Sequence, residues 1–255
     1  MEDGLRVLVA SALGNLLGQV LTEALPHATI VVAIHPAAVH RAVVGRVRFD
    51  AVVADLIWMD PAYEYAFDGL DVLQLLRETN RSAPMIMAVH GHGIERDHLE
   101  EAVTQPEVVG VVHKAAGFGH PIEAVQIAAA GRTLPRTKFP IGHQLIQPTL
   151  DSYFSRGRRG ATAARLAGAI AAGHATDYQS LAAATCIPLN TVNKLVGYLG
   201  PLIEARAEHD SELPMNSHAI YRWCGEHSRY VLSWYRRHSV CDLDRNTLDI
   251  YPKRV

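Results

Sequence analysis

The feature that most constrains the fold is a regular alternation of apolar runs and amphipathic segments over the first 133 residues. The β-rich apolar runs number five and cover residues 6–10, 28–32, 50–55, 84–89 and 108–112. Segments with apolar residues at helical spacing follow them, at 13–25, 36–46, 69–78, 95–103 and 121–130. Repeated β–α units with near-continuously apolar strands predict a parallel sheet covered by helices on both faces. In such a fold, functional groups lie at the carboxyl ends of the strands.

Composition narrows the class of protein. The 255 residues, with 49% hydrophobic and 20% charged residues, predict two folded domains or one large one. No apolar run approaches the roughly 18–20 residues of a membrane span, and the acidic N-terminus lacks a small-residue cleavage site. Three scattered cysteines, Cys186, Cys224 and Cys241, fit neither a disulfide scaffold nor a zinc ribbon. We therefore expect a cytoplasmic protein without a membrane partner.

Charge is divided unevenly along the chain. Residues 1–150 hold 11 Lys and Arg against 16 Asp and Glu, whereas residues 151–255 hold 13 against 10. An acidic first half joined to a mildly basic second half is typical of a sensor joined to a module that binds a polyanion. Because three prolines and a basic tract interrupt the pattern between the halves, we expect a first domain over 1–133, a linker over 134–160 and a second domain over 161–255.

Two charged residues fall at strand ends. Asp55 ends the third apolar run, and Lys114 follows the fifth. An Asp and a Lys at these places, with a closing segment at 128–135, resemble the receiver domain of bacterial response regulators of the NarL/LuxR type. The resemblance covers about residues 5–135. It implies a flavodoxin-like α/β fold with a five-stranded parallel sheet, in which the Asp accepts a phosphoryl group and the Lys contacts it.

Several receiver positions are changed. The resemblance implies acidic residues that hold Mg²⁺ where this chain has Ala10 and Ser11, a hydroxyl where it has Val89, and an aromatic residue where it has Val111. Phosphoryl transfer depends on positioned charge, much of it from the metal. We therefore predict an atypical receiver without a cofactor, in which Asp55 and Lys114 form a vestigial phospho-acceptor pocket.

What the vestigial pair does is left open by the sequence. The two residues either form an ion pair that holds the fold or still define a pocket. The resemblance extends to atypical receivers of antibiotic-producing actinomycetes, which implies a response to small molecules or constitutive dimerisation.

The loops near this strand edge add two candidate features. The segment 56–68 is long and holds four aromatic residues, so it lines a ligand or partner surface or folds onto its own domain. Imidazoles near Asp55 would suit Zn²⁺. They belong to His90, His92, His113 and His120. Because no spacing matches a zinc signature, no metal site is predicted.

The second domain has the spacing of a helix-turn-helix. Helices are predicted over 161–172, over 177–185 with Thr176 or Asp177 as N-cap, and from Asn190 or Thr191 to about Leu199. The predicted core holds Leu181, Ala182, Ala183, Ile187, Val192 and Leu195 or Val196. This arrangement resembles the C-terminal domain of NarL/LuxR-type regulators.

The third helix would read DNA in the major groove. Its outward side chains would be Asn190, Thr191, Asn193, Lys194 and Tyr198. A glycine at 197 and the pair Gly200-Pro201 are expected to weaken it or end it early. Because it holds little positive charge, phosphate contacts are expected from arginines that precede it in the chain. These are Arg156, Arg158, Arg159 and Arg165. An aromatic helix over 217–238 is expected to pack on this core, with a dimer interface as the alternative.

Together these features favour a DNA-binding transcription regulator with a phosphorylation-independent receiver. The expected partners are double-stranded DNA, a second copy of the chain, and a small-molecule ligand or another regulator. The alternative is a protein-binding adaptor or anti-regulator that has lost DNA binding. An enzyme is not expected, because neither a dinucleotide-binding fingerprint nor a P-loop follows the first strand.

Overall fold

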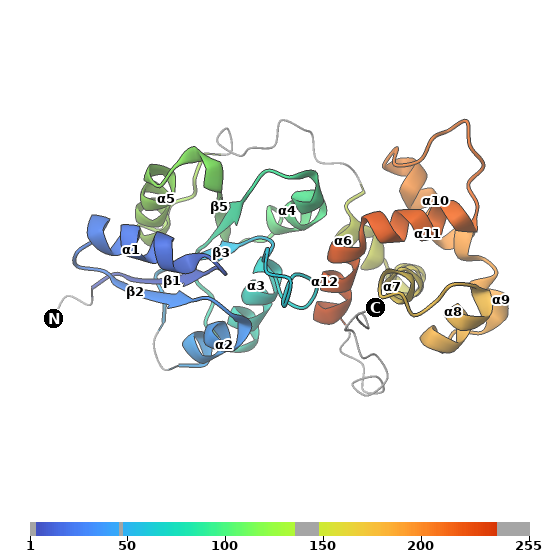
Figure 1. Cartoon of the computed structure of the whole chain (residues 1–255), viewed down its shortest axis with the longest axis horizontal. Coiled ribbons are helices and arrows are strands. Elements are labelled where there is room, and N and C mark those ends of the chain that lie inside the picture. The colour runs from blue at the N-terminus through green and yellow to red at the C-terminus, as the bar shows by residue number, and fades with distance from the viewer. Residues whose placement is uncertain (1–3, 46–47, 136–147, 239–255) are drawn as a thin grey trace. The chain divides into compact units, whose positions relative to one another are not determined.

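The computed structural model describes residues 4–45, 48–135 and 148–238. The chain divides into two compact units, 1–144 and 145–255 (Figure 1). Much of the predicted linker and the end of the C-terminal extension, including Cys241, lie outside the described residues. In the part that is described, no helix is long and apolar enough to cross a membrane.

The first unit contains a five-stranded sheet. Its strands are β1 Arg6–Ala10, β2 Thr29–Ala33, β3 Ala51–Asp55, β4 Met85–Val89 and β5 Val108–His113. All neighbouring strands run parallel, in the order β2-β1-β3-β4-β5. This is the flavodoxin-like order, so the predicted fold class is confirmed.

Helices cover both faces of the sheet. They are α1 Gly14–Ala24, α2 Pro36–Val44, α3 Gly69–Glu78, α4 Arg96–Ala102 and α5 Gly119–Ala129, with 3-10 turns η1 Gly93–Glu95 and η2 Lys114–Ala116. One face packs against α1 and α5, and α2 and α3 lie on the other (Figure 1). Alternate strand residues such as Val7, Val53 and Ile86 form one core cluster with α1 and α5. Burial of both sheet faces explains why the strands are apolar throughout.

The second unit is entirely helical in its described part. Its helices are α6 Leu150–Phe154, α7 Gly157–Ala171, α8 Tyr178–Thr185, α9 Leu189–Val192, α10 Leu195–Ala205, α11 Ser217–Glu226 and α12 Ser228–His238. The central helix is α7, which contacts α6, α8, α10, α11 and α12. Small residues permit this packing: a Cβ at Gly160 would lie 2.4 Å from the carbonyl oxygen of Tyr153.

The end of the predicted linker 134–160 is helical. Residues 150–154 form α6, and α7 begins at Gly157 rather than near residue 161. Thr149 caps α6 by accepting a hydrogen bond from the Ser152 N–H, and Leu150 and Phe154 are each 1% exposed. A single capped turn with two buried anchors is too short for helical periodicity to reveal.

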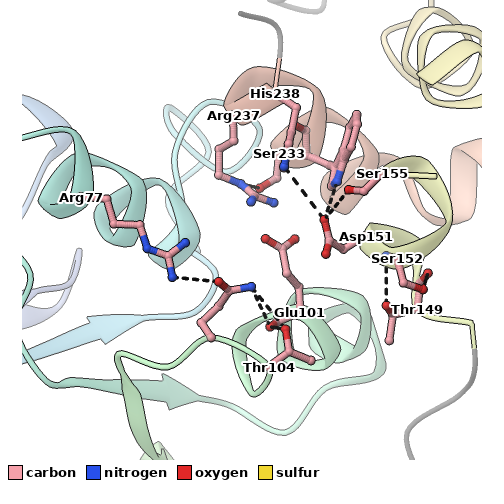
Figure 2. Close-up of polar contacts among 12 residues, drawn as sticks. Arg77, Glu101, Thr104, Thr149, Asp151, Ser152, Ser155, Ser233, Arg237 and His238 are labelled. Carbon is pink, nitrogen blue, oxygen red and sulfur yellow. Dashed lines mark hydrogen bonds and ion pairs between the residues drawn. The ribbon is translucent and has the colours of Figure 1, made fainter. Parts of the chain in front are cut away.

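The predicted aromatic helix 217–238 is two helices that meet at His227. Trp223, Tyr230 and Trp234 are buried, so the expectation that this stretch packs on the domain is confirmed. The Trp234 indole N–H donates to an Asp151 carboxylate oxygen at 2.9 Å. His238 Nε2 lies 4.0 Å from the same oxygen, so that α12, the last described helix, is tied to α6 (Figure 2 labels Asp151 and His238).

Candidate functional site

Asp55 and Lys114 meet at the carboxyl edge of the sheet. Asp55 is the last residue of β3 and is 3% exposed, and Lys114 directly follows β5. Lys114 Nζ lies 2.8 Å from Asp55 Oδ1, and Ser11 Oγ donates to Asp55 Oδ2 at 2.7 Å. Both carboxylate oxygens of Asp55 are therefore bonded by side chains of the same chain.

Ser11 stands where the receiver resemblance implies a metal-binding carboxylate. It is buried, and its Oγ also accepts a hydrogen bond from the Leu13 N–H at 3.2 Å. A hydroxyl supplies no negative charge for a divalent cation, which prefers carboxylate oxygens. The sequence showed the missing acid, but only the structure shows that Ser11 is a hydrogen-bond partner of Asp55.

Burial sets the electrostatics of this centre. Burial raises the pKa of Asp55, and the opposing effects of Lys114, Ser11 and His90 are smaller. Burial and the neighbouring Lys114 ammonium lower the pKa of His90. Lys114 Nζ lies 3.2 Å from His90 Nε2. Because an ammonium only donates, this contact requires Nε2 to be the accepting nitrogen of a neutral imidazole.

The loop after β4 is closed by Glu95, which sequence analysis did not single out. Glu95 is 2% exposed, and its carboxylate accepts backbone N–H groups from His90, Gly91 and His92 at 3.0, 2.7 and 3.0 Å. Successive N–H groups of this kind form an anion-binding concavity. Here that concavity is filled by a carboxylate from η1. A Glu three residues after His92 is a capping-box spacing that could have indicated it.

Within the described residues, no group of three or more His, Cys, Asp or Glu side chains is placed so that it could hold a metal ion. The rings of His90 and His92 stack on each other, with centroids 5.8 Å apart.

The segment 56–68, which we call the aromatic loop, folds onto its own domain. Trp58 is fully buried, and Tyr63 and Phe67 approach it edge-on with ring centroids at 6.5 and 5.2 Å. Ile57 and Asp68 form an antiparallel bridge that closes the loop, and Asp68 then caps α3. Trp58, Tyr63 and Phe67 therefore pack with one another within the domain, and Trp58 belongs to its core.

The helix-turn-helix of the second unit consists of α8, a turn and α9. Asp177 is the N-cap of α8, and Cys186 ends that helix in the left-handed conformation with φ 52°. Leu181, Ile187 and Val192 are buried as predicted. Of the other predicted core residues, Leu195 is buried, Ala182 and Val196 are half-buried, and Ala183 is exposed.

The predicted continuous recognition helix is wrong. The segment breaks after Val192, and Asn193 and Lys194 lie between α9 and α10. The Lys194 N–H bonds to the Thr191 carbonyl three residues earlier, which tightens the chain into a turn. Asn and Thr are weak helix formers, so the exposed part of this segment has little intrinsic helical preference.

The expectation that Gly200-Pro201 ends the helix early is also wrong, because α10 continues through Pro201 to Ala205. A proline inside a helix lacks the N–H that would bond the carbonyl four residues earlier. That carbonyl belongs to Gly197, and Arg159 Nη2 donates to it at 2.5 Å. Arg159 therefore satisfies the carbonyl that Pro201 leaves without its helical partner.

The predicted DNA-binding residues fall into two groups. Asn190, Asn193, Lys194 and Arg158 are exposed, whereas Thr191 is half-buried. The Arg159 guanidinium lies 5.6 Å above the Tyr198 ring. The Tyr198 carbonyl accepts a hydrogen bond from the Tyr153 hydroxyl at 2.6 Å, which holds this pair against α6.

Another predicted phosphate contact, Arg165, is engaged within the domain. Its guanidinium donates to the carbonyl of Thr185, the last residue of α8. Carbonyls at a helix C-terminus have no partner within the helix, so Arg165 stabilises the end of α8. Arg156, by contrast, is exposed.

Comparisons with known proteins find similar solved structures. No family model matches, and no curated protein matches. The Francisella response regulator 1452 receiver domain is 18% identical, with 50% of this chain and 98% of that chain covered and a TM-score of 0.38. Salmonella typhimurium RcsB response regulator is 12% identical over 87% and 98%, with a TM-score of 0.42. A structure of two RcsB dimers bound to two parallel DNAs is 13% identical over 88% and 99%, with a TM-score of 0.47. At these values, the fold assignment rests on strand order and connections.

Proposed function

We propose that this chain is a DNA-binding transcription regulator whose receiver-like domain does not work by phosphorylation of Asp55. The observation that carries the DNA-binding part is the capped and anchored turn between α8 and α9, after which polar side chains are exposed. The observation that carries the second part is that both Asp55 oxygens are bonded to Ser11 and Lys114. The proposal assigns the chain no catalytic residue.

The exposed polar residues suit contacts of two kinds. An Asn side chain pairs bidentately with adenine in the major groove, so Asn190 and Asn193 are proposed to read bases. Lys194 and Arg158 are proposed to bind phosphate, which positions the domain without reading sequence. Arg159 is removed from this set, because its guanidinium is engaged by Gly197 and Tyr198.

The receiver-like site opposes phosphoryl transfer in three ways. Asp55 is 3% exposed, so a donor cannot approach its oxygens without rearrangement. Ser11 stands in place of a carboxylate that would hold the metal. The negatively charged Glu95 side chain already accepts the backbone N–H groups of the loop after β4, so these are not available to a phosphoryl group. A dianionic phosphoryl group at Asp55 would have the Lys114 ammonium beside it but would lack the divalent cation that offsets most of its charge.

A homodimer with DNA as its partner is part of the proposal. A helix-turn-helix regulator that binds as a dimer matches its own two-fold symmetry to two half-sites in the DNA. RcsB, one of the similar proteins, has been described as two dimers bound to DNA. For this chain, the proposed DNA binding rests on the turn between α8 and α9 and on the polar side chains that are exposed after it.

Two experiments test the proposal. Genome-wide DNA capture with the full-length protein, followed by a gel-shift assay on the captured sequences, should yield DNA that the unphosphorylated protein binds. Mass spectrometry after incubation with acetyl phosphate and Mg²⁺ should show no stoichiometric adduct at Asp55. A clean adduct that disappears in Asp55→Asn would contradict the phosphorylation-independent part.

One observation favours a second candidate function. The segment after the turn is broken at Asn193 and Lys194 and contains little positive charge. These features suit a protein-binding adaptor or anti-regulator. If no DNA is bound at low salt by the full-length chain, the adaptor function replaces the regulator.

A further inference from the structure

The first turns of α8 and α11 line one pocket in the second unit. Both helices pack on α7 (Figure 1). The pocket has a volume of about 590 Å³, which is within the roughly 300–1,000 Å³ of small-molecule sites. Its side chains have no part in the proposed DNA contacts. We call it the α8–α11 pocket.

Asp177 gives the α8–α11 pocket a negative charge. It is exposed, and its Oδ1 accepts hydrogen bonds from the Ser180 N–H and hydroxyl at 2.7 and 2.9 Å. These bonds lower the pKa of Asp177, so its carboxylate is ionised near pH 7. A carboxylate has about four lone-pair sites, which leaves room for a further donor. Because neither Lys nor Arg is among the described residues that line the pocket, this charge is open to a cation from outside.

Two tyrosine rings line the pocket together with this carboxylate. Tyr178 directly follows Asp177, Tyr221 lies one turn into α11, and both are half-buried. Burial raises the pKa of Tyr221, and the nearby Asp177 and Tyr178 raise it further, which agrees with three side chains that share one site. The face of an aromatic ring attracts an ammonium ion that lies within about 6 Å of the ring centroid.

The Tyr221 hydroxyl is a polar group without a partner. It is buried, yet it bonds to no group in the described part of the chain. Most buried polar atoms in proteins have a partner, so an unpaired hydroxyl in the wall of a pocket suits a ligand. The first N–H groups of α11 have no partner within the helix either, and Asn216 accepts that of Ala219. Those of Ser217 and His218, which line the pocket, suit an acceptor oxygen.

We propose that the α8–α11 pocket binds a small organic ammonium ion that also carries a hydroxyl or ether oxygen. The ammonium lies between the Asp177 carboxylate and the rings of Tyr178 and Tyr221, and the oxygen faces the first turn of α11. An anion would suit the N-terminus of α11 alone, but the Asp177 carboxylate would repel it. This proposal goes beyond the DNA-binding function and does not depend on it.

A titration of the full-length chain with choline, followed by NMR, tests the site. Choline carries a permanent positive charge and a hydroxyl, and its neutral isostere dimethylbutanol has the same shape with carbon in place of nitrogen. Choline should shift the amide signals of the pocket with a Kd on the order of 1–10 mM, as expected for a ligand of few atoms. The neutral isostere should bind about fivefold more weakly or less, because it lacks the charge.

Two variants separate the contributions of the carboxylate and the ring. Asp177→Asn keeps the helix cap, since Asn caps as well as Asp, and should weaken choline binding by about fivefold. Tyr178→Leu should weaken it by about two- to fivefold. Asp210→Asn is the matched control, because Asp210 is an exposed carboxylate that accepts a backbone N–H from Glu212 and does not line the pocket. It should leave the affinity for choline unchanged, and circular dichroism should show all three variants folded.

Several results would overturn the proposal. They are the absence of choline-dependent shifts at the pocket, equal affinity for choline and its neutral isostere, and an affinity for choline that neither Asp177→Asn nor Tyr178→Leu changes. Inorganic phosphate that binds the same residues more tightly than choline would assign the pocket to an anion and would also overturn it. None of these results depends on whether the protein binds DNA, so the two proposals fail separately.

Discussion

The two regions that resemble functional sites of response regulators differ in where their polar groups find partners. At the sheet edge of the first unit, Asp55 is bonded by Ser11 and Lys114 from its own chain. In the helix-turn-helix of the second unit, Asn193 and Lys194 are exposed. A buried polar group must be bonded within the fold, whereas an exposed one is available to a partner. The polar groups of one candidate site are therefore bonded within the fold, whereas those of the other are exposed to solvent.

A related difference separates two adjacent arginines. Both Arg158 and Arg159 are exposed, but the Arg159 side chain donates to the Gly197 carbonyl that Pro201 cannot serve. Sequence alone gives both the same charge and the same place in a basic tract. Their difference depends on a helix that continues through a proline about 40 residues away.

The largest expected effect concerns the aromatic loop. Trp58→Ala should lower the free energy of unfolding by about 3–5 kcal/mol, because a fully buried aromatic side chain is removed. Met59→Ala, one residue further and 47% exposed, should cost less than about 1 kcal/mol. Urea denaturation measures both. If both substitutions lower the free energy of unfolding by the same small amount, the loop lies on the surface and its side chains are available to a partner.

The second-largest expected loss of stability concerns the ion pair of Asp55 and Lys114. Lys114→Met should destabilise the chain by about 2 kcal/mol, below the roughly 3–5 kcal/mol for fully buried pairs because a quarter of the Lys114 side chain reaches solvent. The double variant Asp55→Asn with Lys114→Met should recover most of the loss, since no buried charge is left. Urea titrations of the single and double variants decide this. If the single variant is as stable as wild type, the pair is not structural.

The recognition segment should respond in DNA binding and not in stability. Asn193→Ala should cost about 1–3 kcal/mol at one base position. Lys194→Ala should weaken binding to all sequences and lower the salt slope by about one. Fluorescence anisotropy on captured DNA at several salt concentrations separates the two effects, and circular dichroism should show both variants folded. If both bind like wild type while Arg158→Ala does not, the reading surface lies elsewhere.

The smallest expected effect tests the role of Arg159. Arg159→Ala should cost about 0.5–1 kcal/mol, because it removes a hydrogen bond to the Gly197 carbonyl at an exposed position that water can reach. In a Pro201→Ala background the cost should fall, since the new N–H can bond Gly197 within the helix. Thermal unfolding of the four proteins in this cycle gives the coupling energy. Additive effects would show that Arg159 does not compensate for Pro201.

Sequence patterns predicted the sheet well, because its strands are buried on both faces and its helices carry regular apolar spacing. The meeting of Asp55 and Lys114 followed from topology, since all strands of a parallel sheet end at one edge and only β4 separates β3 from β5. Patterns failed where single contacts decide the structure. The short helix α6 depends on its two buried residues, Leu150 and Phe154. The continuation of α10 through Pro201 is accompanied by the hydrogen bond from Arg159 to Gly197. Glu95 was missed because its N–H partners come from a loop without periodicity.

The central claim is that DNA binding in the second unit needs no phosphoryl group in the first. Its most direct test compares the affinity of captured DNA for the untreated wild type, for wild type incubated with acetyl phosphate and Mg²⁺, and for Asp55→Asn. The account predicts the same affinity for all three proteins. Tight binding that appears only after acetyl phosphate treatment, and that Asp55→Asn abolishes, would contradict it.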